Sequence, residues 1–397
     1  MDFTILFFLL LTGSYLLREN SYEIKTSFLI LIFYSAPFLF HSNNIAHTHG
    51  VIYNYNISII LIYSYTLFIS ALCYLFLNYT HRTNVRKNLT DINISNGEKI
   101  ITLIAVLGVI TNSILNWQHF GLIKTEYILA PRLSNLLILH LPVESILLAS
   151  IIRKTFVTTG LRIFVLIVYT YAVILDFYLG YRMNLFFLIL TIFYFFFRKY
   201  YLPISFISII LFGDFINAIK NQIQNGFQGN ILDVLKNSFE NFKILTNEQL
   251  NIFSNTFIGI QSGEFFNSIK ELLYFIPLFG KIYPLPHPMS SDKLALLKNV
   301  DPLTGAGVGY SYQLFIYENF LIGSLLLGIV ILLIHFSKGT VFSMIALELF
   351  FSMMRNSTSY WAGIFMKLIL VIFFVYIVTF ILEKKKDSRL YHIINKL

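Results

Sequence analysis

The chain has 397 residues, of which 56% are hydrophobic and only 12% charged, and its mean hydropathy is +0.71. Water-soluble domains average about 25% charged residues, so this composition excludes an ordinary soluble protein and favours a membrane protein. The single cysteine, Cys73, excludes a disulfide framework and a thiolate metal site, and the net charge of +9 has to be explained either by topology or by an anionic partner.

Apolar blocks separated by short polar breaks run along most of the chain. A helix that crosses a bilayer needs about 20 mostly apolar residues. Blocks of this kind lie near 2–17, 26–42, 57–78, 100–117, 135–152, 163–179, 185–197, 202–218, 313–336, 340–354 and 362–382. The sequence therefore predicts an all-α polytopic membrane protein with about eleven transmembrane helices.

The basic residues predict the orientation of these helices. Alternate loops carry seventeen of the 29 lysines and arginines but only six acidic residues. Short loops rich in Lys and Arg stay in the cytoplasm, so these loops, including the tail after residue 382, are predicted to be cytoplasmic. The protein is then expected in the bacterial inner membrane with its N-terminus outside and its C-terminus inside. Orientation accounts for the net charge, and no nucleic-acid partner is expected.

One long segment interrupts the apolar pattern and divides the chain into three parts. Residues 1–212 hold the first eight predicted spans, 213–312 form a large outer loop, and 313–397 hold the last three spans and the tail. Within the loop, 231–239 and 264–276 repeat apolar residues at helical spacing, which predicts amphipathic helices lying along the membrane surface. The Pro-, Ser- and Lys-rich stretch 277–302 predicts an irregular segment.

Three arginines face outward in this topology: Arg132, Arg182 and Arg355. Arg182 and Arg355 lie in tight turns between successive spans. A guanidinium group binds phosphate or pyrophosphate through two parallel hydrogen bonds, most effectively in a partly dry site. These arginines are therefore candidate ligands for a phosphate-bearing substrate, and the alternative is that each one only anchors its helix at the interface.

Five ionisable residues fall within predicted spans, where they are costly and are functional candidates by default. They are Glu144, Asp176, Glu318, Glu348 and Lys367. Glu348 lies two helical turns before Arg355 on the same helix face, which predicts a supporting role beneath that arginine. Asp176 is also given a supporting role, whereas Glu144 follows His140 by four residues, so the two side chains can simply pair with each other.

The outer loop supplies further polar candidates. Tyr310, Gln313, Tyr317 and Glu318 follow a glycine-rich segment and suit hydrogen bonding to sugar hydroxyls, with a helix cap as the alternative role. His287 stands between two prolines, and an imidazole with a pKa near 6.5 suits removal of a proton from a hydroxyl group. The sequence contains no nucleotide-binding or metal-site motif, so no cofactor is expected.

The combination of features resembles the O-antigen and capsule repeat-unit polymerases (Wzy type). The resemblance rests on about eleven spans, a large outer loop in the C-terminal half, and outward arginine turns at Gly180-Tyr181-Arg182 and at Arg355-Asn356-Ser357. It rests also on the loop exit, Gly307 to Ser311 followed by Tyr317-Glu318-Asn319-Phe320. The family has a glycine directly after this phenylalanine, whereas here the glycine is Gly323.

The resemblance implies a fold and a reaction. The fold is that of the lipid-dependent (GT-C-like) glycosyltransferases. The substrates are glycans linked to undecaprenyl pyrophosphate, in contact with membrane lipid, and a chain-length regulator is the implied partner. Arg182 and Arg355 would meet the charge of the leaving pyrophosphate, Glu318 or His287 would orient or deprotonate the acceptor, and Tyr181, Asn319 and Arg132 would contact substrate.

Two other functions fit parts of this pattern. An O-antigen ligase, which transfers the finished glycan to lipid A core, shares the topology and usually has a histidine in its outer loop, as His287 is here. A lipid-linked oligosaccharide flippase or transporter belongs to a different class of protein. Such a protein is expected to have short loops and charged residues along a central cavity, and the large outer loop argues against it.

Overall fold

The computed structural model describes residues 21–40, 95–115, 142–178, 183–224, 268–274, 319–356 and 358–384, with Asp233, Lys236 and Asn255 as isolated residues. These residues form helices α2 (Tyr22–Phe40), α5 (Ser95–Leu115), α7 (Val143–Arg153), α8 (Thr159–Tyr178), α9 (Met183–Phe196), α10 (Tyr201–Gln224), α13 (Ser268–Tyr274), α17 (Phe320–Phe336), α18 (Val341–Arg355) and α19 (Thr358–Lys384). The described part of the chain contains no strand, which confirms the all-α prediction for those residues.

Several helices have the length and composition of membrane spans. Asn96–Leu115, Thr159–Phe177 and Tyr360–Leu382 are long and apolar enough to cross a bilayer, and Met183–Phe196 and Leu321–Phe336 are shorter apolar helices. Helices of this length and composition are typical of a helical membrane protein. The predicted spans 2–17 and 57–78 lie outside the described residues, and the other nine predicted spans overlap these helices.

Two helices differ in extent from the predicted blocks. Helix α7 begins only at Val143, because Pro142 lacks an N–H group and disfavours a helical residue before it. Helix α10 continues to Gln224 and so includes the first twelve residues of the predicted outer loop. In the loop, α13 forms within the predicted amphipathic segment 264–276.

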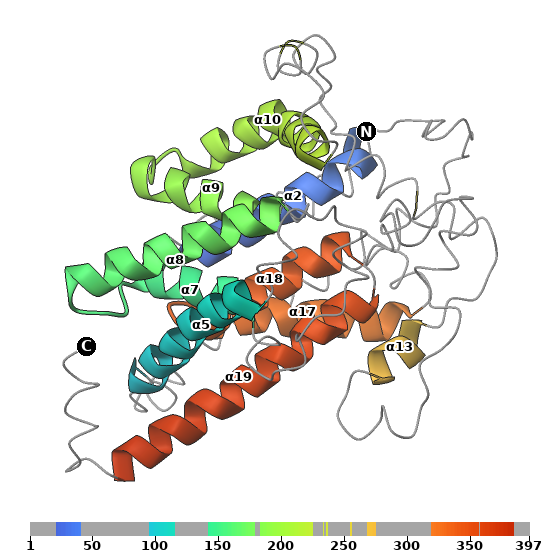
Figure 1. Cartoon of the computed structure of the whole chain (residues 1–397). Helices are drawn as coiled ribbons and strands as arrows, with labels where there is room; N and C mark the ends of the chain where they lie inside the picture. The colour runs from blue at the N-terminus through green and yellow to red at the C-terminus, as the bar shows by residue number, and fades with distance from the viewer. Residues whose placement is uncertain are drawn as a thin grey trace.

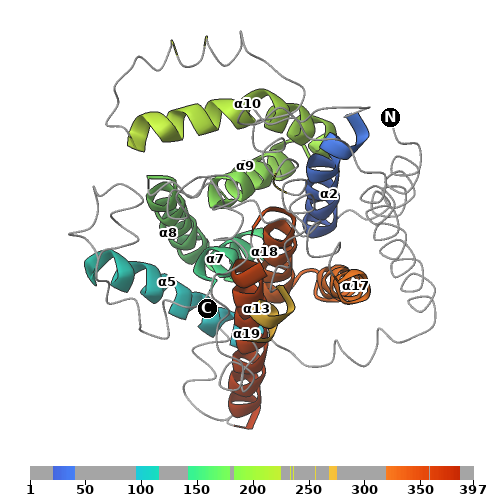
Figure 2. The same ribbon diagram turned by 90° about the vertical axis from the view of Figure 1, so that its right-hand side faces the viewer.

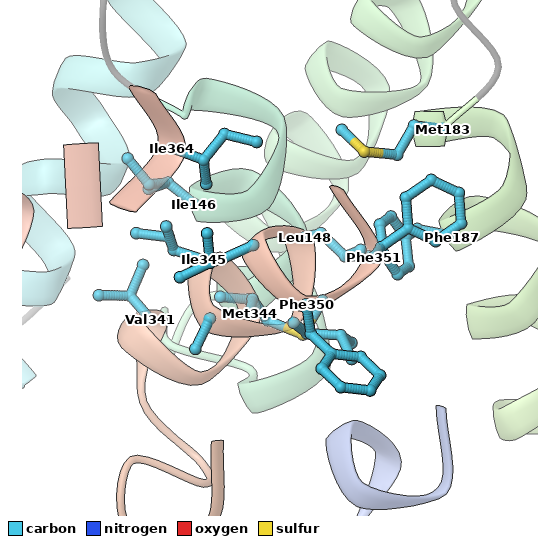
Figure 3. Packing of buried hydrophobic residues seen from close by; sticks show 14 of the residues in the cluster. Ile146, Leu148, Met183, Phe187, Val341, Met344, Ile345, Phe350, Phe351 and Ile364 are labelled. Carbon is cyan, nitrogen blue, oxygen red and sulfur yellow. The ribbon is translucent and has the colours of Figure 1, made fainter. Parts of the chain in front are cut away.

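Helix α18 lies at the centre of the assembly (Figure 2). It packs against α2, α7, α17 and α19, and every residue from Val341 to Met354 is buried. A helix that is apolar on all sides is stable only when other helices surround it. Figure 3 shows its core contacts: Ile345 lies near Ile146 of α7 and Ile364 of α19, and Phe351 lies beside Phe187 of α9.

Carboxylates from two other helices cap the N-terminus of α18. Glu98 accepts a hydrogen bond from the Val341 N–H at 2.9 Å, and Glu23 accepts bonds from the Gly339 N–H at 3.1 Å and the Ser343 hydroxyl at 3.0 Å. Glu98 also pairs with Arg153 at the end of α7. Anionic groups at a helix N-terminus satisfy its free N–H groups and complement its dipole. These contacts fix α2, α5 and α7 against the start of α18.

Several basic residues gather at one end of the fold. In Figure 1 the α7–α8 and α9–α10 turns lie at the same end as the last turn of α19, whereas α13 lies at the opposite end. The first end contains Arg153, Lys154, Arg198 and Lys338, all from loops predicted to be cytoplasmic. We call it the basic end, and the end that carries Arg355 the outer end.

Candidate functional site

An apolar cavity of about 450 Å³ lies beside the outer end of α18. Residues from α2, α9, α10 and α18 line it: Phe33, Tyr34, Met183, Leu185, Phe186, Ile189, Leu190, Ile192, Phe193, Ser208, Ile209, Phe215, Ile216, Phe351 and Arg355. Arg355 is the only charged residue among them. The cavity thus offers a large hydrocarbon surface with a single guanidinium group, and that combination matches a ligand with a long apolar part and an anionic part.

Aromatic side chains position this guanidinium group. The Arg355 guanidinium carbon lies 6.0 Å from the centre of the Phe351 ring, one helical turn earlier on α18, at the distance of a cation–π contact. The Phe351 ring in turn packs against Phe186 at 5.3 Å, Phe187 at 5.5 Å and Tyr34 at 5.8 Å. Helices α2 and α9 therefore hold the ring on which Arg355 rests, and this holds the arginine at the cavity wall.

Four of the five ionisable residues predicted within spans lie near one another between α7, α8, α18 and α19. Lys367 interacts electrostatically with Glu144 and Glu348, and Asp176 interacts with the same two carboxylates. Glu348 is buried, and Glu144, Asp176 and Lys367 are partly buried; we call these four residues the buried charge cluster. It holds three carboxylates and one ammonium group, so it has an excess of acidic groups.

Neutral polar side chains complete the cluster. The Ser145 hydroxyl donates to Glu348 Oε2 at 2.5 Å, and Asn184 Nδ2 donates to Asp176 Oδ2 at 2.5 Å. Buried polar groups need such partners, because each unpaired one costs about 1–3 kcal/mol. Asn184 follows Met183, which lines the apolar cavity, so the cluster and the cavity share the first turn of α9.

The cluster lies deeper in the bundle than Arg355. Seven residues separate Glu348 from Arg355 along α18, a rise of roughly 10 Å at 1.5 Å per residue. The hydrogen bond that the structure gives to Glu348 comes from Ser145 of α7, so this carboxylate takes part in joining α7 to α18. Asp176 likewise joins α8 to α9 through Asn184.

Most of the other predicted site residues lie outside the described residues. This holds for Arg132, Tyr181, Arg182, His287, Tyr310, Gln313, Tyr317 and Glu318, and also for His140, the predicted partner of Glu144. Asn319 is the residue before α17, partly buried, and its carbonyl accepts from the Gly323 N–H at 2.8 Å. The structure thus places Arg355 and Glu348 of the cluster on the same helix, seven residues apart. It describes one residue of the predicted loop motif, Asn319.

Sequence reasoning missed several members of this site. Phe351 precedes Arg355 by four residues, a spacing that places two side chains on one helix face, so this contact was open to prediction. No comparable signal pointed to Ser145, Asn184 or Tyr34. Their roles depend on how different helices pack, and a single sequence does not encode that in any local pattern.

Comparison of the chain with protein-family models, curated proteins and solved structures gave no match. The described residues also contain no group of three or more His, Cys, Asp or Glu side chains arranged to hold a metal ion. Any assignment of function therefore depends on the chemistry of the cavity, Arg355 and the cluster.

Proposed function

We propose that this chain is a membrane glycosyltransferase that polymerises oligosaccharide repeat units carried on undecaprenyl pyrophosphate. The observation that carries the proposal is Arg355, the only charged residue among the described residues that line an apolar cavity. A polyprenyl pyrophosphate joins a long hydrocarbon chain to a strongly anionic head. The cavity offers apolar surface for the chain, and a guanidinium group offers two parallel hydrogen bonds for the phosphate oxygens.

The proposed reaction needs electrostatic help more than it needs a cofactor. A hydroxyl group of the incoming unit attacks the anomeric carbon of the growing glycan, a new C–O bond forms, and the bond to the lipid pyrophosphate breaks. The hydroxyl proton passes to a base, and the pyrophosphate leaves with added negative charge. Arg355, together with Arg182 from the turn predicted before α9, would stabilise that charge, as fixed cations do in other transition states.

The remaining roles follow the sequence motifs. Glu318 or His287 would accept the acceptor proton, and Tyr310, Gln313 and Tyr317 would bind sugar hydroxyls. The cluster with Glu348 and Asp176 would support the cavity from below by fixing α7, α8, α9 and α18. We further propose eleven spans in a GT-C-like arrangement in the bacterial inner membrane, with the site facing the periplasm, and a chain-length regulator as partner.

The proposal is tested by the length of surface polysaccharide in cells whose own copy of the gene is deleted. The cells are complemented with the wild type, with Arg355→Ala, or with Lys384→Gln, which removes an exposed cation from the far end of α19. We expect the wild type and Lys384→Gln to restore the polysaccharide ladder. Arg355→Ala, at matched protein levels, should leave single repeat units on the core.

Other outcomes separate the alternatives. Long chains in the uncomplemented deletion strain would exclude an essential polymerase role. Long polymer that stays on its lipid carrier and never reaches the core would instead indicate a ligase. Absence of any lipid-linked unit from the periplasmic face would indicate a flippase.

A further inference from the structure

A second hollow, of about 560 Å³, lies at the basic end of the bundle, away from Arg355. Its size falls within the range of about 300–1,000 Å³ that ligand pockets occupy. The start of α2, the ends of α7 and α9, and the turn between α17 and α18 form its walls. None of the residues assigned to the proposed reaction lines it.

The lining of this hollow is strongly basic. Arg153, Lys154, Arg198 and Lys338 lie around it, and Glu23 is the only carboxylate among the described residues that line it. Glu23 already accepts from Gly339 and Ser343, so its charge is engaged in capping α18. Arg153 is already paired with Glu98, so Lys154, Arg198 and Lys338 supply the remaining positive charge around the hollow. This excess of cations over carboxylates favours an anionic ligand.

The cations at this end also repel one another. Burial and then the charge of the nearby Arg198 guanidinium lower the pKa of the Lys25 ammonium group on the first turn of α2. Arg198 is held in place through its hydrogen bond with Tyr194, whose ring lines the hollow. A bound anion would relieve this repulsion, and a pre-positioned guanidinium loses less side-chain freedom on binding it.

The backbone places one of these cations at the rim. Lys154 ends α7 with φ 55° and ψ 48°, in the left-handed region, and it is the only non-glycine residue with positive φ among the described residues. Its N–H bonds to the Ile151 carbonyl at 3.2 Å. Glycine is the usual residue at such a helix end because it takes this conformation without strain. A lysine here keeps an exposed cation beside the hollow.

Exposed aromatic residues continue the wall of the hollow along α9. Phe195, 49% exposed, lines the hollow, and the adjacent Phe196 and Phe197 are also exposed. Aromatic side chains next to Arg and Lys are typical of the membrane–water interface. An acyl chain lying along these rings would carry its headgroup phosphate into the hollow.

We propose that the basic hollow is a binding site for a phosphate group, supplied either by an anionic phospholipid or by a soluble phosphate. Basic pockets between transmembrane helices on the cytoplasmic side bind anionic headgroups by the same chemistry. The bound phosphate would join α2, α7 and α9 to the α17–α18 turn. This proposal stands apart from the proposed transferase reaction at the outer end.

The test uses the full chain, purified in detergent and stripped of lipid, with bound lipid counted by native mass spectrometry. Phosphatidylglycerol and phosphatidylcholine of the same acyl composition are titrated separately. The test variant is Lys154→Gly/Arg198→Gln, which removes two cations and gives position 154 its favoured residue. The matched control is Lys199→Gln. Lys199 is exposed and directly follows Arg198, but it does not line the hollow.

We expect phosphatidylglycerol to bind the wild type more tightly than phosphatidylcholine. The double variant should lose roughly thirtyfold in affinity for phosphatidylglycerol, since each cation near the surface contributes about 1 kcal/mol. Lys199→Gln should change it by less than about threefold. If the double variant does not fold, as judged by its circular dichroism, the single variant Arg198→Gln should lose roughly fivefold.

Inorganic pyrophosphate distinguishes the two sources of phosphate. If phosphatidylglycerol stays bound in the presence of millimolar pyrophosphate, the phospholipid is the ligand. If pyrophosphate raises the thermal stability of the wild type but not of the double variant, and the protein does not prefer phosphatidylglycerol to phosphatidylcholine, the ligand is a soluble phosphate. The proposal is overturned if neither binds selectively, or if Lys199→Gln weakens binding as much as the double variant, because the basic residues would then serve orientation alone.

Discussion

At the residue scale, the function of Arg355 depends on the ring beneath it. The Phe351 ring lies 6.0 Å from the guanidinium carbon and is held by Tyr34, Phe186 and Phe187. Phe351→Leu keeps an apolar side chain but removes the π face, which contributes about 0.5–2 kcal/mol to holding a cation. We therefore expect about a two- to thirtyfold loss of polymerising activity.

The control for this prediction is Phe350→Leu, which changes the buried phenylalanine next to Phe351 on the same helix. Both variants should lose similar thermal stability in detergent, but only Phe351→Leu should lose activity beyond that loss. Equal activity in the two variants would mean that the ring contributes packing alone.

The buried charge cluster makes a prediction about charge balance. Lys367 is the cation that faces both Glu144 and Glu348, so Lys367→Met leaves buried carboxylates without it. Breaking a buried pair by removing one partner typically costs about 3–5 kcal/mol, whereas replacing both partners costs less. We expect Lys367→Met to lower the melting temperature strongly and Lys367→Met/Glu348→Gln to recover part of it. Additive losses in the double variant would argue against coupling between the two groups.

At the element scale, helix α5 approaches α19 closely at one glycine. A Cβ atom at Gly97 would stand 2.5 Å from Thr379 Oγ1 and 2.7 Å from the Val375 carbonyl oxygen. The backbone contact cannot rotate away, so Gly97→Ala must push the two helices apart, and overpacking of this kind costs about 1–3 kcal/mol. We expect a clearly lower melting temperature in detergent.

Gly363 provides the matched control within α19. A Cβ atom there meets nothing within 4 Å. Gly363→Ala should leave the stability unchanged or raise it by up to about 1 kcal/mol, because alanine favours helix over glycine. If Gly97→Ala and Gly363→Ala have equal melting temperatures, the α5–α19 contact adjusts to the added methyl group without cost.

The cap of α18 illustrates what sequence reasoning could not supply. The apolar blocks predicted the positions of nine described helices because hydrophobic length is a local signal. Thr340 stands at the N-cap position, but it makes no side-chain cap bond. The caps come from Glu23 and Glu98, more than 240 residues earlier in the chain. The sequence likewise indicates that Glu144, Asp176, Glu348 and Lys367 are each costly to place within a membrane span. That they lie near one another depends on how four helices pack together.

At the scale of the whole molecule, the fold places basic residues at both ends of the bundle. The basic end collects Arg153, Lys154, Arg198 and Lys338, whereas Arg355 stands at the outer end above the cluster. The alternating topology predicted from the loops would place the basic end in the cytoplasm and Arg355 on the outer face. The proposed orientation therefore predicts which residues face the periplasm and which face the cytoplasm.

Thiol labelling tests this orientation. In a Cys73→Ser background, Lys270→Cys on α13 should react with a membrane-impermeant maleimide in intact spheroplasts. Lys154→Cys should react only in inverted vesicles. Both lysines are exposed, so accessibility within the fold does not limit the labelling. The opposite pattern would reverse the proposed orientation and move Arg355 to the cytoplasmic side.

The most direct test of the account is polymerisation by the purified protein. The full chain is reconstituted in vesicles with its lipid-linked repeat unit, and product length is followed on gels for the wild type, Arg355→Lys and Lys384→Gln. We expect the wild type and Lys384→Gln to form a ladder without added metal or nucleotide. Arg355→Lys should be at least about a hundredfold slower, because a lysine cannot provide the two parallel hydrogen bonds of a guanidinium group. Polymerisation by Arg355→Lys at the wild-type rate, or none by the folded wild type, would contradict the account.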